Sequence, residues 1–335
     1  MNKISSYNDI AKGLFDFNIS AFETIALNVF RFQYENNSIY RQFASLTNSS
    51  PEQINTISDI PFLPIQFFKN HEIKTTTFSY ELLFESSGTT QSTPSRHYIK
   101  DAGIYTQSFS KGFARFYGNP SQYCIIGLLP SYLERQHSSL VVMVDELIKQ
   151  SGHPQSGFYL YEQQKLADTL ADLENNNQKT LLIGVTFALL DFAEAFPVPL
   201  KHTIIMETGG MKGRRTEMTR AEVQDELKKA FGVTHIHSEY GMTELLSQAY
   251  SKGEGIFYCP PWMKIMIRDE EDPMHILTPS SYKTRGAINV IDLANIYSCS
   301  FIATEDAGTL YNDGSFEVLG RIDNSDIRGC SLMAM

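Results

Sequence analysis

LLIGVTFALLDFAEAF, residues 181–196, joins a short apolar run to a stretch with helical spacing. The same order recurs along the centre of the chain. YCIIGLLP (123–130) precedes a predicted helix at 133–150, and HTIIM (202–206) precedes another helix after a TGG turn. Short strands that are apolar throughout are buried on both faces, and strands of that kind separated by helices form parallel sheets. The pattern therefore predicts an α/β fold with a mainly parallel sheet flanked by helices.

The helix after HTIIM carries signals at both of its ends. Thr219 and Glu222 have the spacing of a capping box, which satisfies backbone N–H groups of a first helical turn. Gly232 is typical of the position just past a helix. VTHIH (233–237) then predicts the next strand of the sheet.

The two ends of the chain differ from this alternating centre. Apolar residues from Ile10 to Val29 recur at helical spacing, which predicts helices near the N-terminus. Beyond residue 258, the segments WMKIMIRD, MHILT and GAINVIDL are typical of strands joined by turns. The predicted regions are a helical N-terminal region (1–75), an α/β core (76–258), a small β-rich subdomain (259–320) and a C-terminal tail (321–335).

Composition narrows the class of protein. The 335 residues are 42% apolar and carry a net charge of −10, which favours a globular protein and disfavours a nucleic-acid partner. The densest basic cluster, Lys212, Arg214 and Arg215, lies within one expected loop. MNKISSYNDI lacks the apolar core of a signal peptide, and the apolar-rich stretch 180–190 is too short to span a membrane. The four cysteines lack the spacing of a zinc site. Because no export signal is recognised, we expect reduced thiols in a cytoplasmic protein.

FESSGTTQSTPS, residues 84–95, is the first candidate site. Seven of the ten residues from 86 to 95 are Ser or Thr, and hydroxyl and backbone N–H groups in such a loop can surround a phosphate. Gly88 permits a close approach of the backbone. The loop lacks the Gly-Lys-Ser/Thr of a Walker motif, and by composition alone an ordinary polar turn is an equal alternative.

HSEYGMTELLS, residues 237–247, is the second candidate. We expect a strand to end at His237, Tyr240-Gly241 to form a turn, and Thr243-Glu244 to begin the next element. Ligands of open α/β sheets bind at such carboxyl ends of strands. The alternatives are a plain strand-to-helix turn that begins a helix with Glu, and a metal site formed by His235, His237 and Glu239. The metal site is disfavoured because these residues alternate along a strand with no Cys-rich segment nearby.

A third candidate combines IATEDAGTL (302–310) with LGRIDNSDIRG (319–329). Asp306 and Asp323 are expected in turns, and Arg321 follows the strand-like FEVL. Each of these segments by itself is a common surface turn.

Taken in this order, the segments resemble the motifs of the adenylate-forming superfamily, which includes acyl-CoA synthetases and adenylation domains. SSGTTQSTP resembles its phosphate loop, YGMTE its Tyr-Gly-x-Thr-Glu motif, ATEDAG its ribose-binding aspartate segment and GRIDNSDIRG its hinge motif. The chain departs from the family pattern at Gln91, where Gly is usual, and at Ser95, where Lys is usual. The resemblance implies the large-domain fold of these enzymes, with the 76–258 core binding the nucleotide. The chain stops shortly past the hinge motif and its last lysine is Lys283, so no C-terminal lid domain is expected.

Within the superfamily, the chain resembles the LuxE-type acyl-protein synthetases. The likeness extends over LLPSYLERQHSSL (128–140), METGGMKGRR (206–215) and the terminal GRIDNSDIRGCSL. Members of that family activate a fatty acid with ATP and transfer the acyl group to a cysteine near their own C-terminus. The resemblance therefore implies that Cys330 accepts the acyl group as a thioester.

The resemblance also assigns roles to single residues and implies ATP and Mg²⁺ as requirements. Thr243 would contact the α-phosphate, Glu244 would bind Mg²⁺, and Tyr240, followed by Gly241, would pack on adenine. Asp306 and Arg321 would bind the ribose. Lys212 and Arg214 are the candidates for the cation that neutralises the departing pyrophosphate. The residues expected to hold the β- and γ-phosphates are Ser86, Ser87, Gly88, Thr89 and Thr90.

The implied partners are a fatty acid and an acyl reductase subunit that receives the acyl group, with room for an acyl transferase subunit. No nucleic acid and no membrane span is expected. Two alternatives stay open: an acyl- or aryl-CoA ligase with coenzyme A as acceptor, and a non-catalytic module that binds an adenylate or acyl group. A plain scaffold is disfavoured because it would not explain motifs in superfamily order.

Overall fold

The computed structural model describes residues 13–86, 93–130, 136–209, 218–278 and 282–322. The chain divides into two compact units. Unit 1 comprises Met1–Lys111, Met242–Gln248 and Tyr258–Met335, and unit 2 comprises Gly112–Gly241 and Ala249–Phe257. The regions expected from the sequence are continuous stretches and stay predictions, whereas unit 1 gathers three separate parts of the chain.

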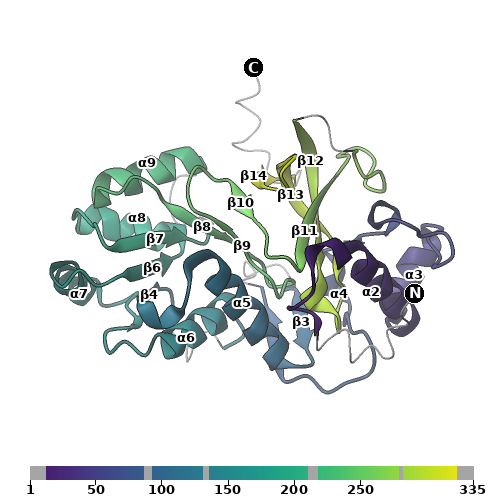
Figure 1. Cartoon of the computed structure of the whole chain (residues 1–335), viewed down its shortest axis with the longest axis horizontal. Helices are drawn as coiled ribbons and strands as arrows, with labels where there is room; N and C mark the ends of the chain where they lie inside the picture. The colour runs from purple at the N-terminus through teal and green to yellow at the C-terminus, as the bar shows by residue number, and fades with distance from the viewer. Residues whose placement is uncertain (1–12, 87–92, 131–135, 210–217, 279–281, 323–335) are drawn as a thin grey trace. The chain divides into compact units, whose positions relative to one another are not determined.

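Unit 2 is built on a parallel sheet with the strand order β9-β8-β7-β6-β4-β5, of which Figure 1 labels β9 to β4. All neighbours pair in parallel except β8 and β9, which are antiparallel. This confirms the α/β pattern of the central sequence. The strands are β4 (Cys124–Leu128), β5 (Gly157–Phe158), β6 (Thr180–Gly184), β7 (Thr203–Glu207), β8 (His237–Tyr240) and β9 (Ala249–Ser251), and the helices are α6 (Ser139–Ser151), α7 (Gln163–Asn175), α8 (Thr186–Ala195) and α9 (Arg220–Phe231).

Helices cover both faces of this sheet. One face packs with α7, α8 and α9 into a core that includes Ile126, Leu170 and Phe192, all fully buried. On the other face, Gly127 leaves room for Val144 of α6 and for the ring of Phe158 on the neighbouring strand β5, because a Cβ atom at this position would lie 2.7 Å from the Phe158 ring and 3.2 Å from Val144. Burial on both faces explains why β4 and β6 have no polar side.

The predicted end signals of α9 are confirmed. The Thr219 hydroxyl accepts a hydrogen bond from the Glu222 N–H, the Glu222 carboxylate accepts one from the Thr219 N–H, and Gly232 adopts φ 62°. The strand expected at 233–237 was placed wrongly, since β8 runs from His237 to Tyr240. Its ladder with β7 pairs only Met206 with His237 and Glu207 with Ser238, so the residues before His237 have no register partner there.

The helix expected at 133–150 is confirmed in its body but not at its start. Residues 131–135 lie outside the described part of the chain, and residues 136 and 137 form a turn. The helix α6 begins at Ser139 because the Ser138 hydroxyl caps it by accepting from the Val141 N–H at 3.4 Å. The cap sets the helix start that apolar spacing left undefined.

Unit 1 contains an antiparallel sheet with the order β11-β12-β13-β14, and β1 adds to β13 in parallel. A separate hairpin pairs β2 with β3. The strands expected in WMKIMIRD and GAINVIDL are confirmed, whereas MHILT forms only one bridge, between Ile276 and Arg268. The strands are β1 (Leu63–Pro64), β2 (Leu82–Glu85), β3 (Arg96–Ile99), β11 (Met263–Arg268), β12 (Lys283–Asp292), β13 (Phe301–Tyr311) and β14 (Phe316–Arg321). The helices are α2 (Phe22–Asn36), α3 (Ser38–Leu46) and α4 (Phe67–Asn70), while α5 (Ala102–Tyr117) and β10 (Phe257–Tyr258) contain residues of both units.

The N-terminal helices pack onto this sheet through aromatic and polar contacts. The Phe301 ring of β13 lies 6.3 Å from Phe30 and 6.0 Å from Tyr40. The buried Gln33 side chain of α2 donates to the Asn295 carbonyl at 3.0 Å and accepts from the Ser300 N–H at 2.9 Å. These bonds hold the 3₁₀ turn η4 (Leu293–Asn295), which contributes to the candidate site.

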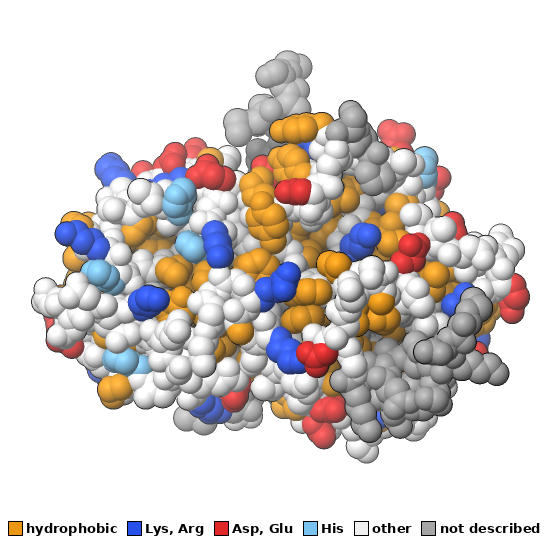
Figure 2. All heavy atoms as spheres, viewed as in Figure 1, with side chains coloured by type: hydrophobic (Ala, Val, Ile, Leu, Met, Phe, Trp, Pro, Cys, Tyr) orange, Lys and Arg blue, Asp and Glu red, His pale blue; other side chains and the backbone are white. Residues whose placement is uncertain are grey.

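None of the described helices combines the length and the apolar character needed to cross a membrane. On the face drawn in Figure 2, basic side chains are mixed with acidic and neutral ones over the described residues. The acidic run Asp269–Asp272 forms an exposed turn, in which the Asp269 carboxylate accepts from the Glu271 and Asp272 N–H groups at 2.7 and 3.3 Å.

Candidate active site

The β2–β3 hairpin of unit 1 carries the Ser/Thr-rich loop. Where the ladder ends, the Ser86 N–H donates to the Ser95 carbonyl at 3.1 Å, and the Ser95 N–H donates to the Ser86 hydroxyl at 2.9 Å. This pair closes the base of the loop. The remaining predicted phosphate contacts, Ser87, Gly88, Thr89 and Thr90, lie outside the described residues.

The segment Met242–Gln248 of unit 1 carries the predicted Thr243 and Glu244. It is not helical, which excludes the alternative of a strand-to-helix turn. The buried Asp292 carboxylate holds the segment by accepting from the N–H groups of Leu246 and Ser247, at 2.8 and 3.0 Å, and from the Ser247 hydroxyl at 2.5 Å. Sequence reasoning missed Asp292, which lies 45 residues along the chain from Ser247.

Glu244 is a buried carboxyl group, with 5% of its surface exposed. Burial raises its pKa, while a hydrogen bond from the Ser95 side chain and the charges of Arg321 and Lys69 act in the opposite direction. Ser95 stands where the superfamily pattern has Lys, so this departure places a hydroxyl rather than an ammonium group beside Glu244. A buried carboxylate that lacks a full counter-charge is suited to a cation supplied with a ligand.

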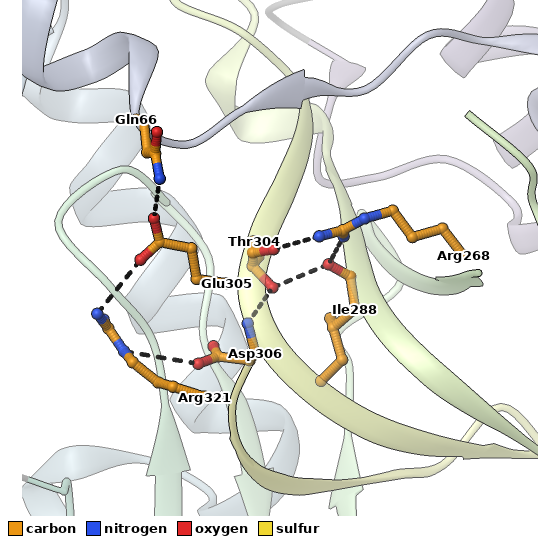
Figure 3. A network of polar contacts seen from close by, with 7 residues as sticks. All are labelled: Gln66, Arg268, Ile288, Thr304, Glu305, Asp306 and Arg321. Atoms are coloured by element: carbon orange, nitrogen blue, oxygen red, sulfur yellow. Dashed lines mark hydrogen bonds and ion pairs between the residues drawn. The ribbon is translucent and has the colours of Figure 1, made fainter. Parts of the chain in front are cut away.

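Asp306 and Arg321 face each other as register partners on β13 and β14. Their side chains lie 4.0 Å apart, and Arg321 also lies 3.4 Å from Glu305, whose carboxylate accepts from Gln66 at 2.7 Å (Figure 3). The structure therefore brings these two predicted residues together. Asp306 was expected in a turn, and this was wrong: it lies within β13, beside a register shift between Ala307 and Gly308.

A buried arginine supports this edge of the sheet. Arg268 of β11 donates to the Ile288 carbonyl at 2.8 Å and the Thr304 carbonyl at 2.6 Å (Figure 3). It also donates to the Asn289 side chain at 2.7 Å. Burial lowers its pKa and the Asp306 charge opposes that shift. The only sequence signal was a lone arginine at the end of the apolar WMKIMIRD.

Unit 2 holds Tyr240 and Gly241 at the carboxyl end of β8. Tyr240 is 8% exposed, and its ring lies 6.0 Å from that of Phe257. The predicted cations Lys212 and Arg214, and the predicted acceptor Cys330, lie outside the described residues.

Two further carboxyl groups belong to β7 and β8: Glu207, which sequence reasoning missed, and Glu239, which it considered only as a metal ligand. The buried Glu207 carboxylate accepts from the Thr186 hydroxyl at 3.0 Å and from the Gly209 N–H at 2.9 Å, which fixes the turn after β7. Burial, together with the Glu207 charge, raises the pKa of Glu239 to about 8. No group of three or more His, Cys, Asp or Glu side chains suited to a metal ion occurs among the described residues.

The three described cysteines are buried or partly buried thiols. Burial raises the pKa of Cys124 to about 11 and that of Cys299 to about 12. The pKa of Cys259 is also raised, mainly by burial and to a smaller extent by the negative charge of Asp292. All three are therefore protonated at neutral pH and weak as nucleophiles.

The fold is that of adenylate-forming ligases. Its characteristic parts are the parallel sheet, the hairpin β2–β3 and the paired strands β13 and β14. The chain belongs to the LuxE acyl-protein synthetase family, whose profile, "Acyl-protein synthetase, LuxE", matches residues 16–335. A search of curated proteins found no match.

Solved structures of low sequence identity share the fold. A 2-hydroxyisobutyryl-CoA ligase in the postadenylation state, in complex with R3-HIB-AMP, has a TM-score of 0.64 and 12% identity, over 93% of this chain and 70% of that one. ATP-bound MatB from Rhodopseudomonas palustris has a TM-score of 0.54 and 15% identity, over 74% of this chain and 50% of that one. The chain thus spans about half the length of MatB.

Proposed function

We propose that this chain activates a fatty acid with ATP to form acyl-AMP and then transfers the acyl group to its own Cys330. Membership of the acyl-protein synthetase family supports the proposal. The observation that carries it is the buried Glu244, which the Ser95 hydroxyl contacts at the base of the Ser/Thr-rich loop. A phosphate loop and an anionic group for its metal are the two elements that nucleotide activation requires.

The proposed ATP contacts follow the motifs. Ser86 and the loop it opens would surround the β- and γ-phosphates, and Thr243 would contact the α-phosphate. Asp306, held beside Arg321 by register, is suited to accept hydrogen bonds from the ribose hydroxyls. Tyr240 would pack on adenine, with Gly241 allowing the close approach that a flat base needs.

The residues present fit Mg²⁺ that arrives with the nucleotide. Among the described residues, the buried Glu244 carboxylate belongs to no group of three or more potential metal ligands, which suits an ion that takes its other oxygens from phosphates and water. When bound, Mg²⁺ would offset the negative charge that builds up on the phosphates.

The first step joins the fatty carboxylate to the α-phosphorus. A carboxylate oxygen forms a bond to the α-phosphorus. The bond from the α-phosphorus to the oxygen that bridges to the β-phosphate breaks, so pyrophosphate leaves. Charge spreads over phosphate oxygens in this step, and hydroxyl and N–H donors of the loop would stabilise it. Lys212 and Arg214 stay our candidates for the cation that neutralises pyrophosphate.

In the second step, the Cys330 thiolate attacks the acyl carbon. A carbon–sulfur bond forms, the carbon–oxygen bond to AMP breaks, and AMP leaves as an anion while the thiol proton has passed to solvent. The raised pKa values of Cys124, Cys259 and Cys299 leave these thiols unsuited to the same role.

The thioester would pass its acyl group to an acyl reductase subunit, and an acyl transferase subunit is a further proposed partner. We expect this chemistry in the cytoplasm, where thiols stay reduced. A coenzyme A ligase is the second candidate function, because the 2-hydroxyisobutyryl-CoA ligase shares the fold over 93% of this chain.

Intact-protein mass spectrometry after incubation with Mg-ATP and tetradecanoic acid tests the proposal. We expect one ATP-dependent acyl adduct, which neutral hydroxylamine removes and Cys330→Ser abolishes. Cys259→Ser is the matched control and should retain the adduct. Release of free acyl-CoA, with no effect of Cys330→Ser, would instead support the coenzyme A ligase. Nucleotide binding without pyrophosphate release would support a non-catalytic module.

A further inference from the structure

Within unit 1, two side chains of the phosphate-loop hairpin, Ser95 and His97, contact the Thr243–Glu244 segment. Ser95 and His97 are two residues apart in extended chain, so their side chains leave it on the same side. Both are buried, with 3% and 1% of their surface exposed. Ser95 contacts the Glu244 carboxyl group, and the His97 Nδ1 lies 2.9 Å from the Thr243 carbonyl oxygen. The hairpin therefore contacts both the side chain of Glu244 and the backbone just before it.

The direction of the His97 bond is determined by its chemistry. A carbonyl oxygen only accepts, so Nδ1 carries the hydrogen and donates it to Thr243. Burial lowers the pKa of His97 to about 4, and its ring packs edge-on against Phe68 at 5.6 Å. His97 is thus a neutral, fixed donor at neutral pH.

Asn295 makes the corresponding bond to the next carbonyl. Its side-chain nitrogen donates to the Glu244 carbonyl oxygen at 2.8 Å, and the residue is fully buried. The bonds from Gln33 to the Asn295 carbonyl and the Ser300 N–H hold the turn that carries it. Two consecutive carbonyl groups are therefore held by two side chains from distant parts of the sequence.

These two bonds restrict the orientation of Glu244. The Thr243 carbonyl belongs to the rigid peptide plane before Glu244, and the Glu244 carbonyl belongs to the plane after it. With both planes anchored, φ and ψ of Glu244 are restricted and the direction of its side chain is set. Both anchors leave polar atoms buried without a partner among the described residues, Nε2 of His97 and Oδ1 of Asn295. A buried unsatisfied atom is costly, so an apolar residue of similar shape would pack more favourably if packing were the only requirement.

We propose that His97 and Asn295 are positioning residues, which hold the two carbonyl groups so that Glu244 presents its carboxylate to nucleotide-bound Mg²⁺. The inference rests on the proposed function of Glu244. It adds two residues that touch neither the nucleotide nor the reacting atoms and that act through the backbone of the metal-binding segment.

Equilibrium binding of ATP, measured by calorimetry with excess Mg²⁺ and with EDTA, tests this role. The ratio of the two dissociation constants measures how much the metal contributes to nucleotide binding. We expect His97→Leu and Asn295→Asp to reduce that ratio at least about tenfold, with ATP affinity in EDTA little changed. His97→Asn should stay within about threefold of wild type, because its amide nitrogen takes the place of Nδ1. His97→Gln should fall, because its nitrogen takes the place of Nε2.

His237 of unit 2 provides the matched control, since its Nδ1 also has one partner, the Tyr117 hydroxyl at 3.1 Å, and its pKa is also lowered to about 4. His237→Leu should leave the ratio at the wild-type value. If His97→Leu does not fold, the comparison of His97→Asn with His97→Gln decides. Equal ratios for those two variants, or a wild-type ratio in His97→Leu, would overturn the inference. A wild-type protein whose ATP affinity is insensitive to Mg²⁺ would instead contradict the proposed role of Glu244 itself.

Discussion

Glu244 shows how the environment of one side chain prepares it for a ligand. The residue is buried, and burial raises its pKa above the ordinary value for a glutamate. The Ser95 hydroxyl and the charges of Arg321 and Lys69 reduce that effect without cancelling it. A cation bound at this carboxylate would offset the remaining cost of burying its charge. The charge state of Glu244 therefore depends on both pH and the bound metal.

Replacing Glu244 tests this dependence. The carboxylate of a group with a raised pKa becomes protonated as pH falls through that raised value, so metal-dependent pyrophosphate release should decline at a higher pH than for an ordinary glutamate, near 4.3. Glu244→Gln should lower the rate by about 100-fold or more. The pH profile of pyrophosphate release, with the fold checked by circular dichroism, measures both effects. Full activity of Glu244→Gln would contradict the metal-binding role.

Asp306 lies on a sheet that contains strands β11, β12 and β13. The Arg268 side chain crosses from β11 to carbonyl groups of β12 and β13, and the Thr304 hydroxyl donates to the Ile288 carbonyl at 2.8 Å. The Asp306 N–H then donates to the Thr304 hydroxyl at 3.2 Å. These bonds between side chains and backbone lie beside the register shift between Ala287 and Asn289 in the β12–β13 ladder, and they hold the strand that carries the proposed ribose contact.

Replacing Arg268 tests the stability of this element. Arg268→Leu removes the donor to the Asn289 side chain and the Thr304 carbonyl in a buried site, while the Ile288 carbonyl keeps the Thr304 hydroxyl, so it should destabilise the chain by about 2–5 kcal/mol. Arg268→Lys keeps the charge but lacks the forked donors, so an intermediate loss is expected. The midpoint of urea unfolding measures both. The exposed Arg285→Leu is the control, and an equal effect at both positions would contradict the assignment.

At the scale of the whole molecule, the two units contribute different parts of the proposed chemistry. Unit 1 carries Ser86, Thr243, Glu244, Asp306 and Arg321, whereas unit 2 carries Tyr240 and Gly241. The chain passes between the units at Gly241–Met242, inside the YGMTE motif. The reactivity of the thiols also depends on the whole fold, because burial raises the pKa of the three described cysteines.

Alkylation tests the distribution of reactive thiols. A pKa raised to about 11 or 12 leaves little thiolate at pH 8, so Cys124 and Cys299 should react slowly with iodoacetamide in the folded protein, as should Cys259. We expect Cys330 to react at least about tenfold faster. Peptide mass spectrometry over time, with urea-unfolded protein as the control in which all four react, measures the rates. Rapid alkylation of Cys124 or Cys299 would contradict the prediction.

Local sequence patterns determined the alternating strands and helices, the cap of α9 and the candidate motifs, because these features depend on residues only a few positions apart. The parallel sheet followed from strands apolar on both faces, and the capping box from one Thr and one Glu. The boundaries of α6 and β8 did not follow, since a cap and a ladder register set them.

Only the tertiary structure decided which side chains support those motifs. His97 meets a carbonyl 146 residues away, and Gln33 meets Ser300 across 267 residues. Asp292, Arg268 and Asn295 are ordinary in sequence and gain their roles from the backbone groups that folding places against them. Buried donors and acceptors must find partners wherever the fold brings them, and no local pattern records a partner that distant.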